Sequence, residues 1–411
     1  MTNISDFMDS PYRFLQARLD ELKIAENLRT LSHAAAEGRY IIKQGRRMLN
    51  LSSNDYLGLA VDMNLRADFL RQISVKDFVP SASSSRLLTG NHPIFDELET
   101  ELAKLYNAES ALLFNSGYDA NSGILPAIAN NDDTLILADK LVHASLIDGI
   151  RLSHAKCIRF RHNDLNHLER LISKNASCYR HIILVTESIF SMDGDEAPLR
   201  EMVDLKRRYP NIMLYVDEAH AFGLRGSQGL GCCEEAGILP DIDLLVGTLG
   251  KAAASAGAFV ICAQTIRDYL INHVRPFIFT TALPPFTVAW SLYIVHNLPQ
   301  MSARRKRLSC ITKRVHQALA TEQVKDISQS HIIPLLIGSS ADAMLQADAM
   351  QRHGFYLLPV RPPTVPEGTA RLRLSLRADL TDEETERLIE EATATPQLHS
   401  YETVSTRTNN S

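Results

Sequence analysis

The chain has 411 residues, a formal net charge of −5, 45% hydrophobic residues and 22% charged residues. A chain of this length can bury a large core and is expected to form more than one lobe. The composition is that of an ordinary globular protein, and without a basic excess nothing in the charge supports a nucleic-acid partner.

The sequence also disfavours a membrane or secreted protein. No apolar run approaches the roughly 20 residues that a membrane-spanning helix needs. The first nine residues lack a basic stretch followed by an apolar one, so no secretory signal is visible. Six scattered cysteines without a Cys-x-x-Cys pair favour reduced thiols over a disulfide framework or a zinc site. We therefore expect a cytoplasmic protein with no membrane span and no metal.

The N-terminal part predicts a helix followed by a strand and a turn. Residues 11–36 carry leucines at a helical period and predict an amphipathic arm that lies across another surface. Arg29 in this arm is most simply a solvated charge. Residues 47–59 indicate a strand that breaks into a polar turn containing Asn54. Residues 83–91 are rich in small side chains, which fits close approach to a ligand or a neighbouring subunit, or else a flexible linker.

From about residue 110 to 262, short apolar runs alternate with helical segments, which predicts a mainly parallel sheet covered by helices. Polar residues follow several of these runs. Because the carboxyl ends of parallel strands meet at one edge of a sheet, we expect these polar side chains to gather there. The runs are at 111–114, 134–139, 181–187, 212–217 and 243–248.

Three of these strand ends suggest contacts to a phosphorylated, flat cofactor. The turn at Gly117 and Tyr118 leads into a helix whose free N–H groups could bind phosphate, although many such turns contain Ser-Gly. His143 could stack on a flat ring, or it could cap a helix. Ser191 lies in a turn with two acids, which we expect to close over the site, because a metal site would need further ligands at definite spacing.

The strongest signal is the combination of Asp217, His220, Thr248 and Lys251 after two apolar runs. A lysine amine can form a Schiff base with pyridoxal phosphate (PLP), an acid can pair with its pyridine nitrogen, and the other groups can orient the ring. Asp-x-x-His alone occurs in many unrelated folds. Followed by Thr-x-Gly-Lys, it favours a PLP site.

Near the C-terminus, Arg371, Arg373, Ser375 and Arg377 alternate with leucines and predict a half-buried strand. An arginine on such a strand can bind a carboxylate with two hydrogen bonds. A solvent-facing stripe is the alternative, and it fits most of these arginines.

Six sequence strings resemble the α-oxoamine synthase family of fold-type-I PLP enzymes, and the resemblance covers about residues 11–390. They are Ser-Ser-Asn54-Asp-Tyr-Leu-Gly, Ser-Arg-Leu-Leu-Thr-Gly-Asn91, Phe-Ser191-Met-Asp-Gly-Asp, Val-Asp217-Glu-Ala-His220, Thr248-Leu-Gly-Lys251 and Arg-Pro-Pro-Thr364-Val-Pro. The resemblance implies an α/β fold of the aspartate aminotransferase type, with a mainly parallel central sheet and a smaller α+β C-terminal domain. The domains expected are an N-terminal helical segment at 1–46, a PLP-binding domain at 47–285, a small domain at 286–390 and a disordered tail at 391–411.

The resemblance also implies roles for individual residues. Lys251 would carry the PLP, Asp217 would pair with its pyridine nitrogen, and His220 would bond its phenolic oxygen. The remaining roles are ring stacking by His143, a position near the ring for Ser191, phosphate binding by Gly117, Tyr118 and Thr248, carboxylate binding by Asn54 and Arg373, and substrate contact by Arg29 and Thr364. For Arg29, this implied substrate contact replaces the simpler interpretation as a solvated charge. The sequence departs from the family at residues 252–254, three alanines where glycines are usual, and at Glu218, where aspartate is common.

The strings favour the family member that joins L-alanine to a pimeloyl thioester, carried by coenzyme A or a carrier protein, in biotin biosynthesis. The family's sites lie between two subunits, so a homodimer is implied. One alternative is a sibling that condenses glycine or serine with another acyl-CoA. A non-catalytic assembly subunit is disfavoured because Lys251, Asp217 and His220 are all present, and a nucleotide-binding oxidoreductase because no G-x-G-x-x-G follows an early strand.

Overall fold

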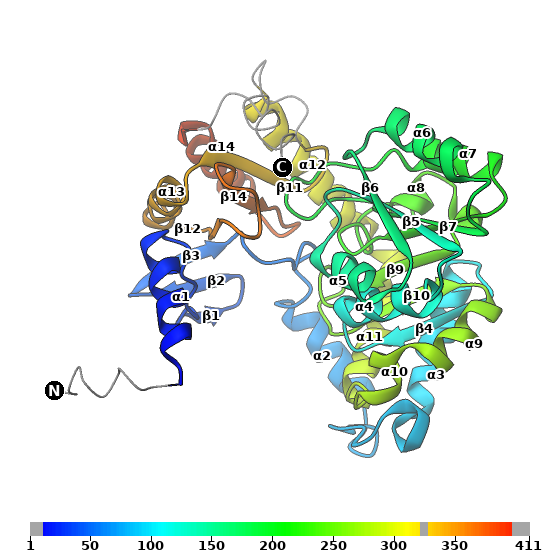
Figure 1. Cartoon of the computed structure of the whole chain (residues 1–411). Coiled ribbons are helices and arrows are strands. Elements are labelled where there is room, and N and C mark those ends of the chain that lie inside the picture. Colours follow the sequence, from blue (N-terminus) through cyan, green and yellow to red (C-terminus); the bar gives the residue numbers. More distant parts are fainter. Residues whose placement is uncertain (1–10, 321–327, 397–411) are drawn as a thin grey trace.

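The computed structural model describes residues 11–320 and 328–396, and it divides into a large α/β part and a smaller α+β part (Figure 1). The large part is built on a seven-stranded sheet in the order β4-β10-β9-β8-β7-β5-β6. Within this sheet β10 runs antiparallel to both of its neighbours, and the expectation of a mainly parallel sheet is confirmed. The strands are β4 (Ser110–Phe114), β5 (Thr134–Asp139), β6 (Lys156–Phe160), β7 (His181–Glu187), β8 (Ile212–Asp217), β9 (Leu244–Thr248) and β10 (Ala258–Cys262).

The central strands have mainly apolar side chains on both faces because helices cover both faces of the sheet. Leu112 and Leu113 are neighbours in β4, yet they belong to two separate core clusters, one on each face. One face packs against α4 (Gly117–Ile128), α5 (Ala144–Leu152), α9 (Gln264–His273) and α10 (Arg275–Phe279). The other packs against α3 (Pro93–Leu105), α6 (Leu165–Asn175), α7 (Leu199–Arg208) and α11 (Pro285–Asn297).

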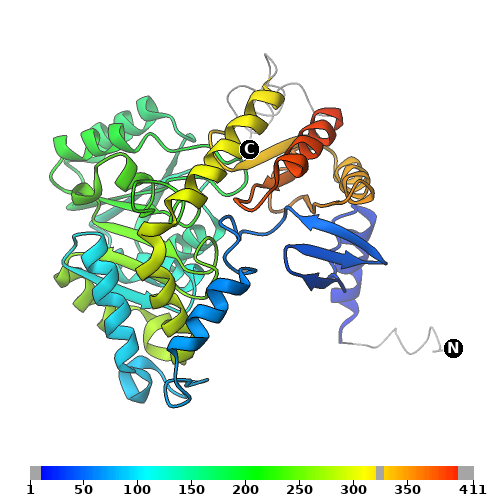
Figure 2. The ribbon, with the colours of Figure 1, turned by 180° about the vertical axis from the view of Figure 1, so that it is seen from behind.

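The smaller part combines the C-terminal chain with the N-terminal strands (Figure 2). One sheet has the order β11-β14-β13, and the other has the order β1-β2-β3-β12. In the second sheet β12 pairs in parallel with β3, so Phe355 lies opposite Leu49. The strands are β1 (Ala35–Glu37), β2 (Tyr40–Lys43), β3 (Arg46–Asn50), β11 (Ile332–Gly338), β12 (Phe355–Tyr356), β13 (Pro359–Val360) and β14 (Ala370–Ser375).

Three long helices complete the small part: α12 (Ser302–Leu319), α13 (Ser340–Arg352) and α14 (Asp382–Ala394). The remaining elements are α1 (Arg13–Ile24), α2 (Met63–Gln72), α8 (Cys232–Glu235), η2 (Arg86–Gly90), η3 (Leu239–Asp241) and η4 (Leu298–Met301). Among the residues that the structure describes, no helix is both long enough and apolar enough to cross a membrane.

Two expectations from the sequence need correction. The leucine spacing over 11–36 predicts a longer helix than the structure contains. Helix α1 ends at Ile24, and Glu26 then takes a left-handed φ of 54°. No residue of α1 is buried within this chain. The strand with alternating arginines, β14, is buried on both faces, and its Arg371 pairs with Asp193. Arg377, two residues beyond the strand, is also buried and pairs with Asp55.

The expected division into domains stays a prediction, and the structure adds two facts to it. The strand β3 shares a sheet with β12, so residues 46–50 lie with the small part of the molecule. Helix α14 continues to Ala394, past the expected start of the tail, and residues 397–411 lie outside the described chain.

Candidate active site

Acidic and basic side chains meet at the carboxyl ends of the central strands, as expected for an open α/β sheet. Glu187 ends β7 directly opposite Asp217, the last residue of β8. Thr248 ends β9, and Lys251 lies in the turn that follows. The polar groups predicted from separate strand ends are thus brought to one edge of the sheet.

A chain of hydrogen bonds starts at Lys251. Its Nζ lies 2.8 Å from Nε2 of His220, and Nδ1 of His220 lies 2.8 Å from the hydroxyl of Tyr56. The Tyr56 hydroxyl donates to Oδ1 of Asn54 at 2.9 Å. Because the Tyr56 proton goes to Asn54, the imidazole donates from Nδ1 and accepts from Lys251 at Nε2.

Burial governs the protonation of these groups. It lowers the pKa of Lys251 to about 8, although the charge of Asp217 opposes this shift. Burial, with the nearby charges of Lys251 and Arg373, holds the pKa of His220 well below its usual range. A substantial fraction of the lysine is therefore a neutral amine near physiological pH, which is the form that attacks an aldehyde.

Asp217 is held by donors on both carboxylate oxygens. Oδ2 accepts a hydrogen bond from the side-chain amide of Asn121 at 2.7 Å, and Oδ1 accepts one from the backbone N–H of Ala219 at 2.8 Å. The hydroxyl of Tyr215 donates to Oδ1 of Asn121 at 2.7 Å, which fixes the orientation of the amide. The carboxylate is therefore rigidly placed beside the lysine.

His143 begins helix α5, where its Nδ1 accepts from the backbone N–H of Ser145 and lies 2.8 Å from the Ser145 hydroxyl. Burial lowers the pKa of its imidazole. Its backbone N–H donates to the carboxyl of Glu187. Burial and the charge of Asp217 raise the pKa of Glu187 well above its usual range, so this carboxyl adds little negative charge beside Asp217.

The N-terminus of α4 lies close to the end of β9. A Cβ added to Gly117 would come no closer than 3.9 Å to any neighbour, and the neighbour it meets is Thr248. The first N–H groups of a helix have no partner within the helix and point toward anions. Thr248 adds a hydroxyl that donates to the Gly257 carbonyl at 3.1 Å. The N-terminus of α4 and the Thr248 hydroxyl therefore lie next to each other at this edge of the sheet.

Arg373 reaches the same hydrogen-bond chain from β14. It donates to the hydroxyl of Tyr56 at 3.2 Å and to Oδ1 of Asn54 at 3.3 Å. Its Nε donates to the backbone carbonyl of Ser191 at 2.6 Å. Arg373, Asn54 and Ser191 are therefore placed together.

Three predicted residues have exposed side chains and do not join this hydrogen-bond chain. Arg29 donates to the hydroxyl of Thr364 at 3.0 Å and contacts the carbonyl of Pro362 at 3.5 Å. Arg29 and Thr364 are exposed, and the structure pairs them with each other. Tyr118 is also half exposed, and its hydroxyl donates to Asp148.

Sequence reasoning missed several residues of the cluster, namely Tyr56, Asn121, Glu187, Tyr215 and His331. Tyr56 lies two residues after Asn54, so its place in the same polar turn was the available signal. His331 is buried with its ring edge-on to Tyr56 at 4.1 Å between centroids. No signal in the sequence marks Asn121 or Tyr215, because their partners lie on other elements.

Of the two departures from the family pattern, Glu218 is satisfied by hydrogen bonds, whereas the alanine run carries backbone strain. The longer side chain of Glu218 reaches the backbone N–H groups of Cys232 and Cys233 at 3.0 and 2.7 Å, and it also accepts from Ser188. Ala254 takes a left-handed φ of 49°, a conformation in which an alanine is strained and a glycine is not.

The acidic turn after β7 is held by a histidine. Nδ1 of His162 lies 2.9 Å from Asp139, and its Nε2 lies 2.6 Å from Asp195. Asp193 of the same turn pairs with Arg371. Within residues 11–320 and 328–396, no group of three or more His, Cys, Asp or Glu side chains is arranged to hold a metal ion. The turn that carries Ser191 is thus fixed by ion pairs.

The family model described as "Aminotransferase class I and II" matches residues 46–391. The chain belongs to this family. A protein of Pasteurella multocida, provisionally named 8-amino-7-oxononanoate synthase, is 51% identical over 378 residues, which cover 92% of this chain and 97% of that protein. A Haemophilus influenzae (strain 86-028NP) protein with the same provisional name is 50% identical over 90% of this chain and 98% of its own length.

Solved structures agree with these relatives. A serine palmitoyltransferase from S. paucimobilis with a bound PLP–myriocin adduct is 27% identical, with a TM-score of 0.84 over 94% of this chain and 98% of that one. An 8-amino-7-oxononanoate synthase from Francisella tularensis is 28% identical, with a TM-score of 0.69 over 84% of this chain and 97% of that one. The expected α-oxoamine synthase resemblance, the fold type and PLP as cofactor are confirmed, and the chain is an enzyme of the acyltransferase kind.

The charge of His162 predicts a pH-dependent stability. Burial alone would lower the pKa of His162, but the bonds and charges of Asp139 and Asp195 outweigh it and raise the pKa to about 10. A pKa raised in the folded state stabilises the protein fully below about pH 6.5, and this stabilisation is lost as the pH rises through 10. His162→Gln should therefore lower the free energy of unfolding by roughly 2–3 kcal/mol at pH 6, and by much less at pH 10.

Urea unfolding of both proteins between pH 6 and 10 measures this difference. His167→Gln, a substitution in the helix that follows, serves as the control. Its difference from wild type in the free energy of unfolding should not shrink comparably between pH 7 and 10. A His162→Gln deficit that stays constant across that range would contradict the assignment of a charged His162.

Proposed function

We propose that this chain catalyses the decarboxylative condensation of L-alanine with a pimeloyl thioester, giving 8-amino-7-oxononanoate, CO2 and a free thiol, in biotin biosynthesis. The supporting observation is that Arg373, a cation suited to a carboxylate, is linked through Tyr56 and His220 to the amine of Lys251. A site of this kind can bind an amino acid by its carboxylate while a base faces its Cα. The names of the relatives agree with this reaction.

The residues present fit PLP as the cofactor. When bound, PLP supplies an electron sink that makes the Cα–H bond of an amino acid acidic. We assign Lys251 as its point of attachment, Asp217 as the partner of the pyridine nitrogen and His220 as the partner of the phenolic oxygen. His143 would stack on the ring beside Ser191, and the backbone at Gly117 and Tyr118, with Thr248, would hold the phosphate.

In this proposal the side chains act in sequence. Arg373 and Asn54 bind the carboxylate of L-alanine, which orients its Cα toward Lys251. The Nζ of Lys251, once free, removes the Cα proton, and its lowered pKa of about 8 suits a base that works near neutral pH. The exposed pair Arg29 and Thr364 is assigned to the acyl substrate, whose thiol is carried by coenzyme A or a carrier protein.

A substrate panel tests the reaction. Purified protein should release thiol and CO2 with L-alanine and pimeloyl-CoA, or with the pimeloyl carrier protein, at least tenfold faster than with glycine or L-serine. Mass spectrometry of the product identifies the acyl chain. Faster turnover with glycine or serine and another acyl-CoA would instead assign the chain to a sibling reaction.

The role of Lys251 is tested by substitution. Lys251→Ala should remove the absorbance band of the lysine-bound cofactor. It should also lower kcat by about 10⁴-fold, because both the attachment point and the base are lost. Lys251→Arg is the charge-preserving control and should lose the band as well. A band retained in either variant would show that the cofactor is attached elsewhere.

We further propose that the protein is a cytoplasmic homodimer. Leu88 in η2 and Phe279 in α10 are 79% and 70% exposed, and the two elements pack against each other. Helix α10 also packs against α4, whose N-terminus is the proposed phosphate site. An exposed apolar patch next to the site fits burial against a second copy of the chain.

Sedimentation equilibrium should give a mass twice that of one chain. The double substitution Leu88→Glu and Phe279→Glu should shift the protein toward monomers, because it places charges in the proposed interface. Leu345→Glu, at a leucine that is 65% exposed on α13, is the control and should leave the mass unchanged. A wild-type protein of single-chain mass would contradict the proposal.

A further inference from the structure

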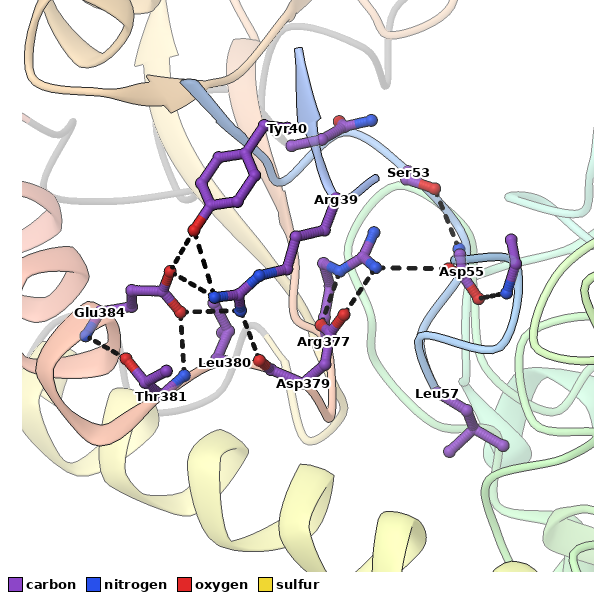
Figure 3. Close-up of polar contacts among 12 residues, drawn as sticks. Arg39, Tyr40, Ser53, Asp55, Leu57, Arg377, Asp379, Leu380, Thr381 and Glu384 are labelled. Carbon is purple, nitrogen blue, oxygen red and sulfur yellow. Dashed lines mark hydrogen bonds and ion pairs between the residues drawn. The ribbon is translucent and has the colours of Figure 1, made fainter. Parts of the chain in front are cut away.

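The turn after β3 has side chains on two sides, and the proposed function uses only one of them. Asn54 and Tyr56 contact Arg373 and, through Tyr56, His220. Asp55 lies between them in the sequence and faces the small part of the molecule instead (Figure 3). Its side chain is 8% exposed, and its Oδ2 lies 3.3 Å from Nη2 of Arg377.

Arg377 is the largest side chain that is almost completely buried, with 2% of it exposed. It donates to both carboxylate oxygens of Asp379, at 2.8 and 2.9 Å. A buried arginine needs such partners, and removing one of them leaves an uncompensated charge. Arg377 therefore ties Asp55 to the segment that follows β14.

Backbone contacts place the same two segments against each other. The N–H of Ala378 donates to the carbonyl of Tyr56 at 2.7 Å, and the N–H of Ser375 donates to the carbonyl of Leu51 at 2.9 Å. Gly58 has a φ of +68°, and a Cβ there would lie 2.8 Å from Oδ2 of Asp379. The turn and the segment after β14 are thus in direct contact on both sides of Asp55.

Two arginines from one stretch of chain therefore hold three consecutive residues. Arg373 contacts Asn54 and Tyr56, and Arg377 contacts Asp55. Asn54, Asp55 and Tyr56 all lie in one short turn. A small displacement of that turn would therefore misplace Asn54 and Tyr56 relative to Arg373.

We propose that Asp55 and Arg377 are positioning residues for amino-acid binding, because their ion pair fixes Asn54 and Tyr56 against Arg373 before the carboxylate of the substrate arrives. This inference rests on the proposed function of Arg373. The Asp55–Arg377 ion pair lies outside the reacting groups, yet under this inference it has a measurable effect on substrate affinity. A purely structural ion pair would change stability alone.

The network offers a matched control in its other branch. Arg39 binds Glu384 and the backbone carbonyl of Asp379, and the Tyr40 hydroxyl donates to Glu384 (Figure 3). Glu384 also completes the capping box of α14 with Thr381. This branch shares Asp379 with Arg377, but among the described residues its side chains form no hydrogen bond or ion pair with Asn54, Asp55 or Tyr56.

The test compares Asp55→Asn with Glu384→Gln in the PLP-loaded protein. Asp55→Asn should raise the dissociation constant for L-alanine, measured by the change in cofactor absorbance, about tenfold. It should also speed amide hydrogen exchange over residues 51–60, measured by mass spectrometry. Glu384→Gln should speed exchange over 381–394 and change the dissociation constant less than twofold.

The outcomes separate the two proposals. An Asp55→Asn protein with wild-type exchange over 51–60, or with a dissociation constant within twofold of wild type, would overturn the inference. So would a Glu384→Gln protein with an equal loss of affinity. If Asp55→Asn does not fold, Arg377→Lys keeps the buried charge, loses the two-pronged contact and gives the same comparison. A wild type whose absorbance does not respond to L-alanine would count against the proposed function, and the exchange over 51–60 would still decide whether the ion pair fixes the turn.

Discussion

The hydrogen bond between Lys251 and His220 is the interaction on which the arrangement of this site depends. His220 follows the β8 strand of the large sheet, and its other nitrogen bonds Tyr56, which follows strand β3 of the small part. One neutral imidazole therefore connects the lysine to Asn54 and Arg373. Because the imidazole is buried, its pKa is lowered, and it can accept from the lysine without competing for the positive charge.

The buried charges around this imidazole are tolerated because each has specific partners. Asp217 accepts from Asn121 and Ala219, and Arg377 is enclosed by Asp55 and Asp379. Isolated charges in such places would cost several kcal/mol or change their protonation. Glu187 shows the second course, since its raised pKa favours the neutral acid beside Asp217. Asp217 thus lies beside a carboxyl group that favours its neutral form.

Much of this arrangement could be predicted from the sequence because strand ends are local features. Asp217, His220 and Lys251 each follow an apolar run, and parallel strands bring such positions together. Asn121 and Tyr215 could not be found in this way, since their partners lie on other elements. The burial of Arg377 also depends on Asp55, which is 322 residues away in the sequence. Strand β6 was missed because it is an edge strand with charged residues and lacks a continuous apolar run.

The parallel pairing of β3 with β12 has a consequence for the order in which the molecule forms. Leu49 leaves the ribosome early, whereas its neighbour Phe355 is made only when most of the chain has been translated. The large sheet has all its strands once residue 262 has been made, and it can collapse before Phe355 is synthesised. Contacts between such distant residues form slowly because a long loop must close first. The turn with Asn54 and Tyr56 therefore gains its contacts to Arg373 and Arg377 only near the end of synthesis.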